Sequence, residues 1–288
     1  MKQRGTWLAW VLVGMVAFVQ GAWAQGPGGV RKQVEASMRV TGMITIRADG
    51  GVAAVALDKQ DRLPEGIPDF VTKVASAWRF EPVLIGGVPT QVQTKMSARL
   101  VAKSTGDGMM QVSVRGADFG DYEAIPVEER VSSVSLKPPG YPMVAARSGA
   151  QGTVYLLLKI ERDGSVSEVV AEQVNLRIVV SEPQMRLYRE RFSRAAIGAA
   201  EKWAFTPPTR GEAAEQPHWV IRVPVDFTFD AKRRYGQWEA YVPGPRERVS
   251  WAQQEDRPGF SPDVLADGGV HMEGGMQGPK LLTPLDGV

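Results

Sequence analysis

Two stretches of this 288-residue chain alternate apolar and polar residues in a way that predicts β-hairpins. In each stretch two apolar runs flank an Asp-Gly pair, which favours a tight turn because glycine adopts positive φ at little cost. We interpret the two Asp-Gly pairs as turn residues rather than as a pair of catalytic carboxylates. The first hairpin is expected at Met38–Ile46, Asp49-Gly50 and Val52–Leu57, and the second at Thr153–Ile160, Asp163-Gly164 and Val166–Val174.

A helix is predicted after each hairpin, since apolar residues recur there at intervals of three and four. The first stripe runs from Ile67 to Trp78 and the second from Met185 to Trp203. Both helices end in a Trp-x-Phe-x-Pro sequence, so the chain should leave each helix extended, with Trp and Phe on one side. The residues interpreted as structural anchors are Trp78, Phe80, Trp203, Phe205 and Pro207.

A further strand is expected to close each unit, at Val92–Val101 and at Trp219–Phe229. In the second of these strands the odd-numbered residues are apolar and should face the helix. The even-numbered residues Arg222, Pro224, Asp226 and Thr228 should face water. Because proline cannot donate to a ladder, Pro224 places this strand at a sheet edge or beside a bulge. The predicted fold class is α+β, with two tandem β-β-α-β units in which one helix packs on a small antiparallel sheet.

The pattern divides the chain into five parts. An inter-domain segment contains one more strand candidate, Met109–Val114, and an acidic patch from Asp118 to Glu129. The last part is rich in Gly and Pro without a sustained period, a composition typical of disordered or loosely docked chain. The parts are a signal peptide at 1–24, the first unit at 25–101, the inter-domain segment at 102–135, the second unit at 136–230 and the tail at 231–288.

The N-terminus has the pattern of a secretory signal peptide. Lys2 and Arg4 precede an apolar run from Trp7 to Val19, and Ala22-Trp23-Ala24 forms an A-x-A cleavage pattern. The run is short for a membrane span, which needs about 20 apolar residues. We therefore expect an exported, soluble mature chain, with an uncleaved membrane anchor as the alternative.

Composition removes several classes of function. The absence of Cys excludes disulfides, thiolate metal sites and cysteine nucleophiles, and two His leave little for other metal sites. A formal net charge of +2 argues against nucleic acid as a partner, because phosphate binding needs a clear cationic surplus. No nucleophile, base and acid stand at recognisable spacing. The sequence therefore predicts neither an enzyme nor a metal or small-molecule cofactor.

The second unit resembles the C-terminal domain of the TonB family over about Leu136 to Asp230. The first unit is similar to a degenerate copy of it, because it keeps the Asp-Gly turn and the Trp-x-Phe-x-Pro sequence but has no Tyr-Pro lead-in. The resemblance is carried by Tyr141-Pro142, Ala145, Gly149, Gly152-Thr153-Val154, Asp163-Gly164, Ala199-Ala200, Trp203–Pro207 and Val223–Phe227.

This resemblance implies a protein of the Gram-negative periplasm whose closing strand pairs with a short peptide, the TonB box, of outer-membrane transporters. An edge strand suits that role because it offers unpaired N–H and C=O groups to an incoming strand. The segment Pro138-Pro139-Gly140 stands where well-known members have Gln-Pro-Gln, a departure that bears on receptor recognition. The partner-binding residues implied are Pro138, Pro139, Gly140, Tyr141, Val220, Arg222, Pro224, Asp226 and Thr228.

Several readings of this resemblance stay open at the level of sequence. A working energy transducer of the family keeps an inner-membrane helix and a long Pro-rich spacer, whereas here an A-x-A pattern follows the apolar run and no such spacer precedes the first unit. We therefore expect a periplasmic protein that binds a peptide segment of an outer-membrane transporter or another envelope protein. The alternatives are an inner-membrane-anchored energy transducer, a structural homodimer joined edge to edge, and a closing strand already covered by the other unit or by the tail.

Overall fold

The structure is a computed structural model that describes residues 27–106, 109–120, 125–229, 235–252, 262–264, 270–272 and 278–285. The predicted signal peptide at 1–24 lies outside the described residues. Within them, no helix has the length and apolar character that crossing a membrane requires. Export of the chain therefore stays a prediction.

The described chain is built from short helices and antiparallel strands. Up to residue 135 the elements are α1 (Pro27–Arg31), β1 (Glu35–Ile46), β2 (Val52–Leu57), η1 (Gln60–Arg62), α2 (Ile67–Ser76), β3 (Leu84–Ile85), β4 (Val88–Pro89), β5 (Val92–Gly106), β6 (Met109–Phe119), η2 (Val127–Glu129) and β7 (Ser132–Ser135). After residue 142 they are α3 (Met143–Arg147), β8 (Gly152–Ile160), β9 (Val166–Leu176), α4 (Glu182–Ala200), β10 (Ala204–Thr206), η3 (Glu212–Glu215), β11 (Trp219–Phe227), β12 (Glu239–Tyr241), η4 (Pro262–Val264) and β13 (His271–Met272).

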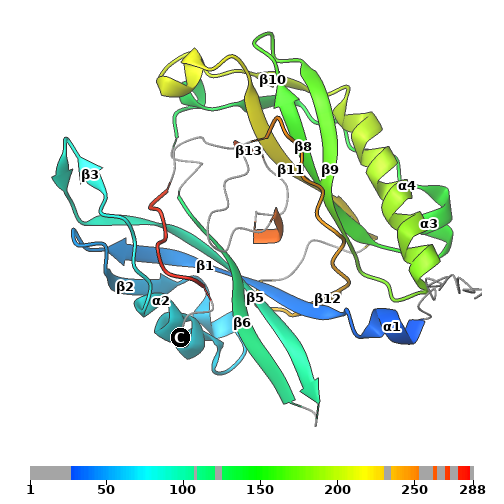
Figure 1. Cartoon of the computed structure of the whole chain (residues 1–288), viewed down its shortest axis with the longest axis horizontal. Helices are drawn as coiled ribbons and strands as arrows, with labels where there is room; N and C mark the ends of the chain where they lie inside the picture. The colour runs from blue at the N-terminus through cyan, green and yellow to red at the C-terminus, as the bar shows by residue number, and fades with distance from the viewer. Residues whose placement is uncertain are drawn as a thin grey trace, which may run out of the picture.

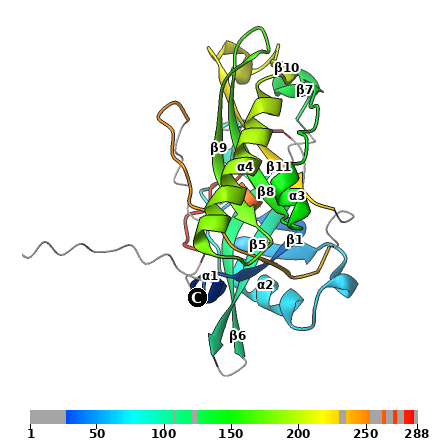
Figure 2. The ribbon, with the colours of Figure 1, turned by 90° about the vertical axis from the view of Figure 1, so that its right-hand side faces the viewer.

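Two sheets, each with one helix packed on it, confirm the predicted α+β class (Figure 1). The first module consists of β1, β2, α2, β5 and β6, and the second module consists of β8, β9, α4 and β11. Helix α2 contacts β2, and helix α4 lies across β8 and β9 (Figure 2). The order of elements in each module is therefore the hairpin, helix and closing strand that the sequence predicts.

The first sheet has the strand order β12-β1-β5-β6, with β2 also pairing with β1. Strand β1 pairs with β5 from Ala36 opposite Ala102 to Ile46 opposite Val92. The strand expected in the inter-domain segment forms as β6 and continues to Phe119, on the outer side of β5. The closing strand of the first module is thus an inner strand of its sheet.

The second sheet has the strand order β13-β11-β8-β9. Its middle strand β8 is buried on both faces, unlike a strand with one wet face. Helix α4 begins in a capping box formed by Ser181 and Gln184, which satisfies its first N–H groups. The helix buries Met185, Tyr188 and Phe192 against the sheet, as their spacing predicts.

In both modules the glycine of the Asp-Gly turn accepts a hydrogen bond from the chain that follows the helix. Gly50 and Gly164 adopt φ values of +82° and +83°. Gly50 O accepts the N–H of Phe80 at 2.8 Å, and Gly164 O accepts the N–H of Phe205 at 3.0 Å. A Cβ on either glycine would lie 2.0 Å from the carbonyl oxygen of the same phenylalanine, so a side chain there requires the backbone to move.

The side chains of the two turn aspartates accept hydrogen bonds from backbone N–H groups. Asp49 Oδ1 accepts the N–H of Gly51 at 2.9 Å, and Asp163 Oδ1 accepts the N–H of Ser165 at 2.9 Å. The backbone hydrogen bond lowers the pKa of Asp49, and the hydroxyl and N–H of Ser165 lower the pKa of Asp163. Both carboxyl groups are exposed and belong to separate modules, so they do not form a pair.

The two tryptophans at the helix ends differ in one hydrogen bond. Trp203 Nε1 donates to Lys137 O at 2.9 Å, which ties the lead-in of the second module to the end of α4. Trp78 is 2% exposed, and its Nε1 has no partner within the described residues. The first module lacks the lead-in, which explains the missing acceptor. Pro207 lies beside the second turn, with its Cδ 3.5 Å from where a Cβ on Gly164 would stand.

Several described segments of the tail, which composition predicts to be disordered or loosely docked, contact the two modules. Strand β12 pairs with β1, and Val242 forms an antiparallel bridge with Leu176 at the end of β9. Leu281 pairs with Phe80 and lies in the core of the first module. These segments bury isolated apolar residues, without a regular period, against surfaces that the two sheets provide.

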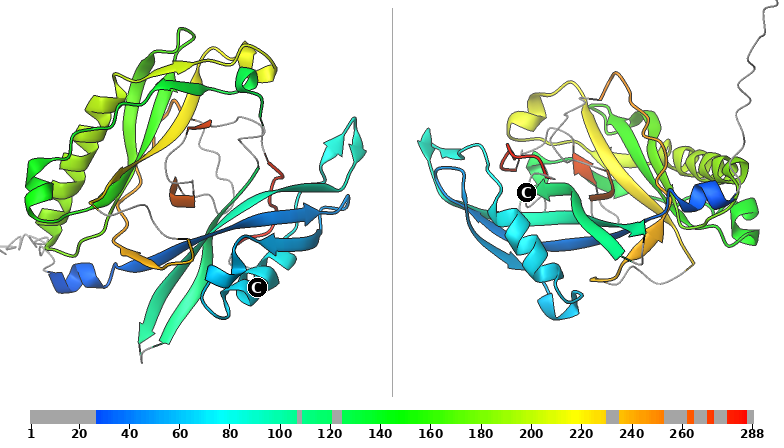
Figure 3. Two further views of the ribbon diagram at one scale, coloured as in Figure 1. Left: turned by 180° about the vertical axis from the view of Figure 1, so that it is seen from behind. Right: turned by 60° about the horizontal axis from the view of Figure 1, so that its bottom comes forward.

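Segments from both ends of the chain join the modules. Val30 in α1 is fully buried in the core of the second module, although α1 precedes the first module in sequence. In the tail, η4 contacts β5, β6 and β11 and lies between the two sheets (Figure 3). Residues near both ends of the described chain therefore contribute to the packing of the modules, and the predicted domain boundaries stay a prediction.

Candidate functional site

The candidate site is the outer edge of β11 together with the lead-in at residues 138–141. One face of β11 packs into the core of the second module. Its five apolar side chains there are Trp219, Ile221, Val223, Val225 and Phe227. Their burial in this core, where the ring of Phe227 stacks on Phe192 of α4, holds the backbone of β11 in place before any partner arrives.

The opposite face of β11 is not the wet face that the sequence predicts. Val220 packs with Leu157 and Ala252, and Val249 and Trp251 pack around this small cluster. Pro224 is buried as well. The reason for the difference is that the tail crosses this face and covers it with apolar side chains, which strand alternation alone does not predict.

Arg222 belongs to a buried ion triad on the same face. Glu172 on β9 is 1% exposed, and it accepts hydrogen bonds from Arg222 Nε at 2.8 Å and from Arg246 Nη2 at 2.6 Å. Arg246 lies in the tail, and the N–H of the next residue, Glu247, donates to Glu172 O at 2.7 Å. Arg222 is thus paired inside the protein, and the triad fixes the tail along β9.

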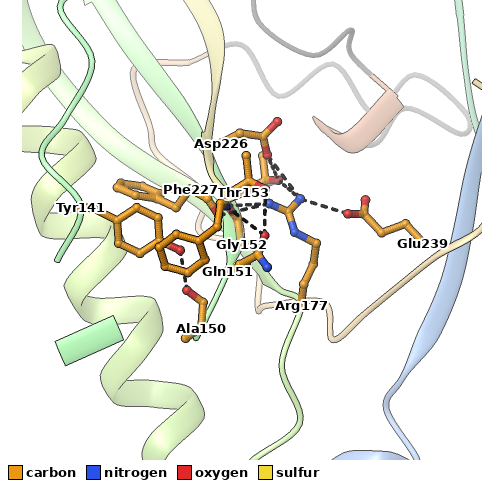
Figure 4. A network of polar contacts seen from close by, with 11 residues as sticks. Tyr141, Ala150, Gln151, Gly152, Thr153, Arg177, Asp226, Phe227 and Glu239 are labelled. Atoms are coloured by element: carbon orange, nitrogen blue, oxygen red, sulfur yellow. Dashed lines mark hydrogen bonds and ion pairs between the residues drawn. The ribbon is translucent and has the colours of Figure 1, made fainter. Parts of the chain in front are cut away.

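The C-terminal end of β11 is held by Arg177, which follows β9 (Figure 4). Arg177 Nη2 donates to the carbonyl oxygen of Phe227 at 3.2 Å, and its Nη1 lies 3.4 Å from Asp226 Oδ1. The same Nη1 lies 3.3 Å from Glu239 Oε1 on β12. Asp226 also accepts the hydroxyl of Thr153. The exposed Asp226 is therefore part of a network that joins β8, β9, β11 and β12.

Tyr141 and Phe229 form a stacked aromatic pair just beyond this network. Their ring centroids lie 4.5 Å apart, and the Tyr141 hydroxyl donates to Ala150 O at 2.6 Å. Burial raises the pKa of the Tyr141 phenol above its usual value of 10.0. Phe229, expected to face the helix, lies past the end of β11 and is 55% exposed. The pair gives the end of the strand an apolar surface.

The remaining sequence-predicted residues lie near this end of the strand. Pro138 and Gly140 are exposed and Pro139 is half-buried. The Thr228 hydroxyl donates to Gln151 Oε1 at 2.8 Å. The lead-in and the C-terminal end of β11 are therefore brought together by Tyr141, whereas Val220, Arg222 and Pro224 lie on the face that the tail covers.

Within the described residues, the outer edge of β11 is paired at Ile221 and Arg222. Strand β13 places Met272 opposite Ile221 and His271 opposite Arg222. Within the described residues, no other strand lies on the outer side of β11. In an antiparallel sheet, alternate residues of a strand direct N–H and C=O to each side. Pro224 has no N–H to give to either side.

Three features of the site escaped the sequence: Glu172, Arg177 and β13. Glu172 and Arg177 act through contacts with residues far away in the chain, so local spacing carries no signal for them. An alternation of apolar residues at Val270 and Met272 was present and could have suggested a short strand. In the part of the chain that the structure describes, no group of three or more His, Asp or Glu side chains could hold a metal ion.

Comparison with known proteins shows which family the second module resembles. Residues 137–229 match the family model described as Gram-negative bacterial TonB protein C-terminal. Protein tonB2 of Pseudomonas aeruginosa is 37% identical over 89 residues, which cover 31% of this chain and 28% of that protein. Protein TonB of Xanthomonas campestris pv. campestris is 34% identical over 102 residues, which cover 35% of this chain and 39% of that protein. The chain thus spans less than two fifths of the length of these relatives.

The comparison with solved structures also gave a match. The solution NMR structure of the Pseudomonas aeruginosa TonB CTD is 20% identical, with a TM-score of 0.22. The match covers 38% of this chain and 94% of that chain.

Proposed function

We propose that this protein, whose residues 137–229 belong to the TonB C-terminal family, binds an extended segment of another envelope protein at the outer edge of β11. The observation that carries the proposal is the partial pairing of this edge. Strand β13 pairs with Ile221 and Arg222, and the rest of β11 has no strand on its outer side within the described residues. An incoming strand could therefore extend the sheet along Val223–Phe227 by main-chain hydrogen bonds.

The surroundings of the edge support such binding. A partner strand pays less conformational entropy when the strand it meets is already rigid. The core-facing side chains of β11 are buried, and Arg177 holds the carbonyl of Phe227 at its end. The stacked Tyr141 and Phe229 provide an apolar surface for a side chain at the end of the added strand.

The partner we propose is the TonB-box segment of an outer-membrane transporter, met in the periplasm. Two relatives of this chain are TonB proteins, which favours a place in TonB-dependent transport. The role of the ion triad is then structural, since it holds the tail on the covered face and leaves the end of β11 accessible. No step of this proposed function makes or breaks a covalent bond.

Disulfide trapping tests the proposal, and the chain has no native Cys to interfere. Thr228→Cys marks the exposed end of β11, and Ser167→Cys marks an exposed position on β9, at the other side of the same sheet. The probes are synthetic peptides that cover the TonB boxes of outer-membrane transporters, each with a single Cys added at one end. We expect a mixed disulfide with Thr228→Cys and little with Ser167→Cys. Equal trapping at both positions, or trapping at Ser167→Cys alone, would count against strand addition at β11.

A further inference from the structure

The two modules differ in the segment that joins the end of the helix to the closing strand. In the second module this segment is charged, since it contains Arg210 and, in η3, Glu212 and Glu215. In the first module the equivalent segment, from Pro82 to Gln91, has no charged residue and forms the hairpin β3–β4. The hairpin is therefore a feature of the first module and not a part of the repeated unit.

A residue of the Asp-Gly turn holds the segment of the second module, and the first module lacks that residue. Arg162 comes just before the turn aspartate, and its Nη1 donates to Gln216 O at 2.8 Å. The first module has Ala48 in the same place, and an alanine side chain has no donor to offer to the hairpin. The hairpin stands away from both sheets (Figures 1 and 3).

The hairpin presents apolar side chains on both of its faces. The two glycines at 86–87 adopt φ values of +60° and +82°, and a tight two-residue turn needs positive φ at both positions. Ile85 pairs with Val88, and Leu84 pairs with Pro89. Residues opposite each other in a ladder lie on the same face, so each face carries one of these pairs. Leu84, Ile85 and Val88 are 60%, 59% and 62% exposed.

Two apolar faces suit a surrounding medium that is itself apolar on every side. A hairpin that docks on a protein surface buries one face and turns a polar face to water. No charged residue stands between Glu81 and Lys95, so inserting the hairpin into a bilayer surface would place no charge in hydrocarbon. The pairing of β3 with β4, and the bond from Thr90 N–H to Val83 O at 2.9 Å, satisfy backbone groups that are costly to leave unpaired there.

We propose that the β3–β4 hairpin inserts its apolar side chains into the surface of a phospholipid bilayer. The peptide groups of the glycine pair lie outside the ladder, so the insertion is shallow and reaches the boundary between head groups and acyl chains. The hairpin has no cation, so its binding does not depend on anionic head groups or on low salt. The inference goes beyond the proposed function and does not rest on it, because it concerns the other module.

A fluorescent label on the hairpin tests the inference, and the absence of native Cys allows one labelling position at a time. Val88→Cys carries an NBD group on the hairpin, and Ser167→Cys carries the same group at an exposed position on β9. The full chain, as the cell processes it, is mixed with vesicles of phosphatidylcholine alone or with added phosphatidylglycerol, at low and at high salt. We expect the emission from Val88→Cys to shift to the blue with both kinds of vesicle and at both salt concentrations. The emission from Ser167→Cys should stay unchanged.

Substitutions within the hairpin show whether its apolar side chains cause the shift. In labelled Val88→Cys, the pair Leu84→Thr/Ile85→Thr keeps residues that favour strands but removes apolar surface, so the lipid concentration at half-maximal shift should rise about tenfold. The matched control Met109→Thr/Met110→Thr removes side chains that are 64% and 54% exposed on β6, and it should leave that concentration unchanged. Equal effects of the two pairs would refute the role of the hairpin.

Other results of the same experiment would also overturn the inference. An unchanged emission from Val88→Cys at saturating lipid would show that the hairpin stays in water. A shift that needs phosphatidylglycerol and disappears at high salt would show adsorption by charge and not insertion. Blue emission without vesicles would mean that protein covers the hairpin: a second copy if the emission depends on protein concentration, and another part of the same chain if it does not.

Discussion

The substitution Glu172→Ala tests the ion triad that holds the tail against the second module. Glu172 is 1% exposed and receives hydrogen bonds from both Arg222 and Arg246. Removing the carboxylate takes away the hydrogen bonds and the negative charge that Glu172 supplies to both guanidinium groups. The Arg222 side chain is 11% exposed, so its charge stays largely desolvated, whereas Arg246 at 38% can turn to water.

The expected loss follows from this asymmetry. Removing one partner of a buried ion pair costs about 3–5 kcal/mol, because the remaining charge is buried without compensation. Since Arg246 can escape to solvent, we expect a loss near the lower limit, about 3 kcal/mol in the free energy of unfolding. For a protein of this size about 1 kcal/mol shifts Tm by about 2–4 °C, so Tm should fall by about 6–12 °C.

Urea unfolding followed by tryptophan fluorescence measures this loss, with Glu168→Ala as the matched control. Glu168 lies on the same strand and pairs with Lys159 at 3.4 Å, but its side chain is 46% exposed. Surface pairs contribute about 0–1 kcal/mol, so the control should change little. Similar losses for Glu168→Ala and Glu172→Ala would refute the reasoning, because burial would then not decide the cost.

Three further predictions concern the repeated turn and helix end, each measured by urea unfolding. Gly164→Ala should cost about 3 kcal/mol because its Cβ would lie 2.0 Å from a carbonyl oxygen, whereas Gly66→Ala, at φ +77° with open space around it, should cost about 1 kcal/mol; equal losses would contradict this. The lowered pKa of Asp163 means that its stabilisation is present above the usual value of 3.8 and is lost as pH falls through the lower folded value. Asp163→Asn should therefore differ from the natural chain more at pH 6 than at pH 3, and a difference that grows in acid would be evidence against the turn contacts. Trp203→Phe should cost about 1 kcal/mol more than Trp78→Phe, because only the indole of Trp203 has an acceptor to lose within the described residues; equal costs would remove the assigned role of the lead-in.

The parts of the fold that depend on neighbouring residues could be predicted from the sequence. The apolar alternation from Trp219 to Phe227 places those side chains in the core because strand geometry repeats every two residues. The Asp-Gly turns form because positive φ is needed at Gly50 and Gly164, and glycine is the residue that adopts it readily. In these places a local pattern and the final packing agree.

The parts that depend on distant segments could not be predicted in the same way. Arg246 meets Glu172 across 74 residues of sequence, and neither residue shows by its local pattern that the other is near. The wet face expected at Val220 and Pro224 is covered because the tail returns to it. The tail has no regular period, so its composition indicated disorder although its isolated apolar residues pack in both cores.

In the candidate site, too, local features could be predicted from the sequence and long-range contacts could not. The sequence located the strand and the aromatic residue Tyr141, whose ring stacks on Phe229 at the end of β11. It did not show that Arg177 would secure that end, since Arg177 acts on carbonyl groups of Gly152 and Phe227, which any residue could supply. Nor did we predict β13, although Val270 and Met272 alternate around His271.

The central claim is that the edge of β11 accepts a partner's backbone, and an NMR measurement tests it most directly. A saturating TonB-box peptide with isotopic labels distinct from those of the protein would be added to the full chain, and intermolecular nuclear Overhauser effects between backbone protons would be recorded. The account predicts contacts of the peptide with Val223, Val225 and Phe227, together with slower amide exchange along β11. A peptide that binds with its backbone contacts on β9 or β6, and leaves β11 unchanged, would contradict it.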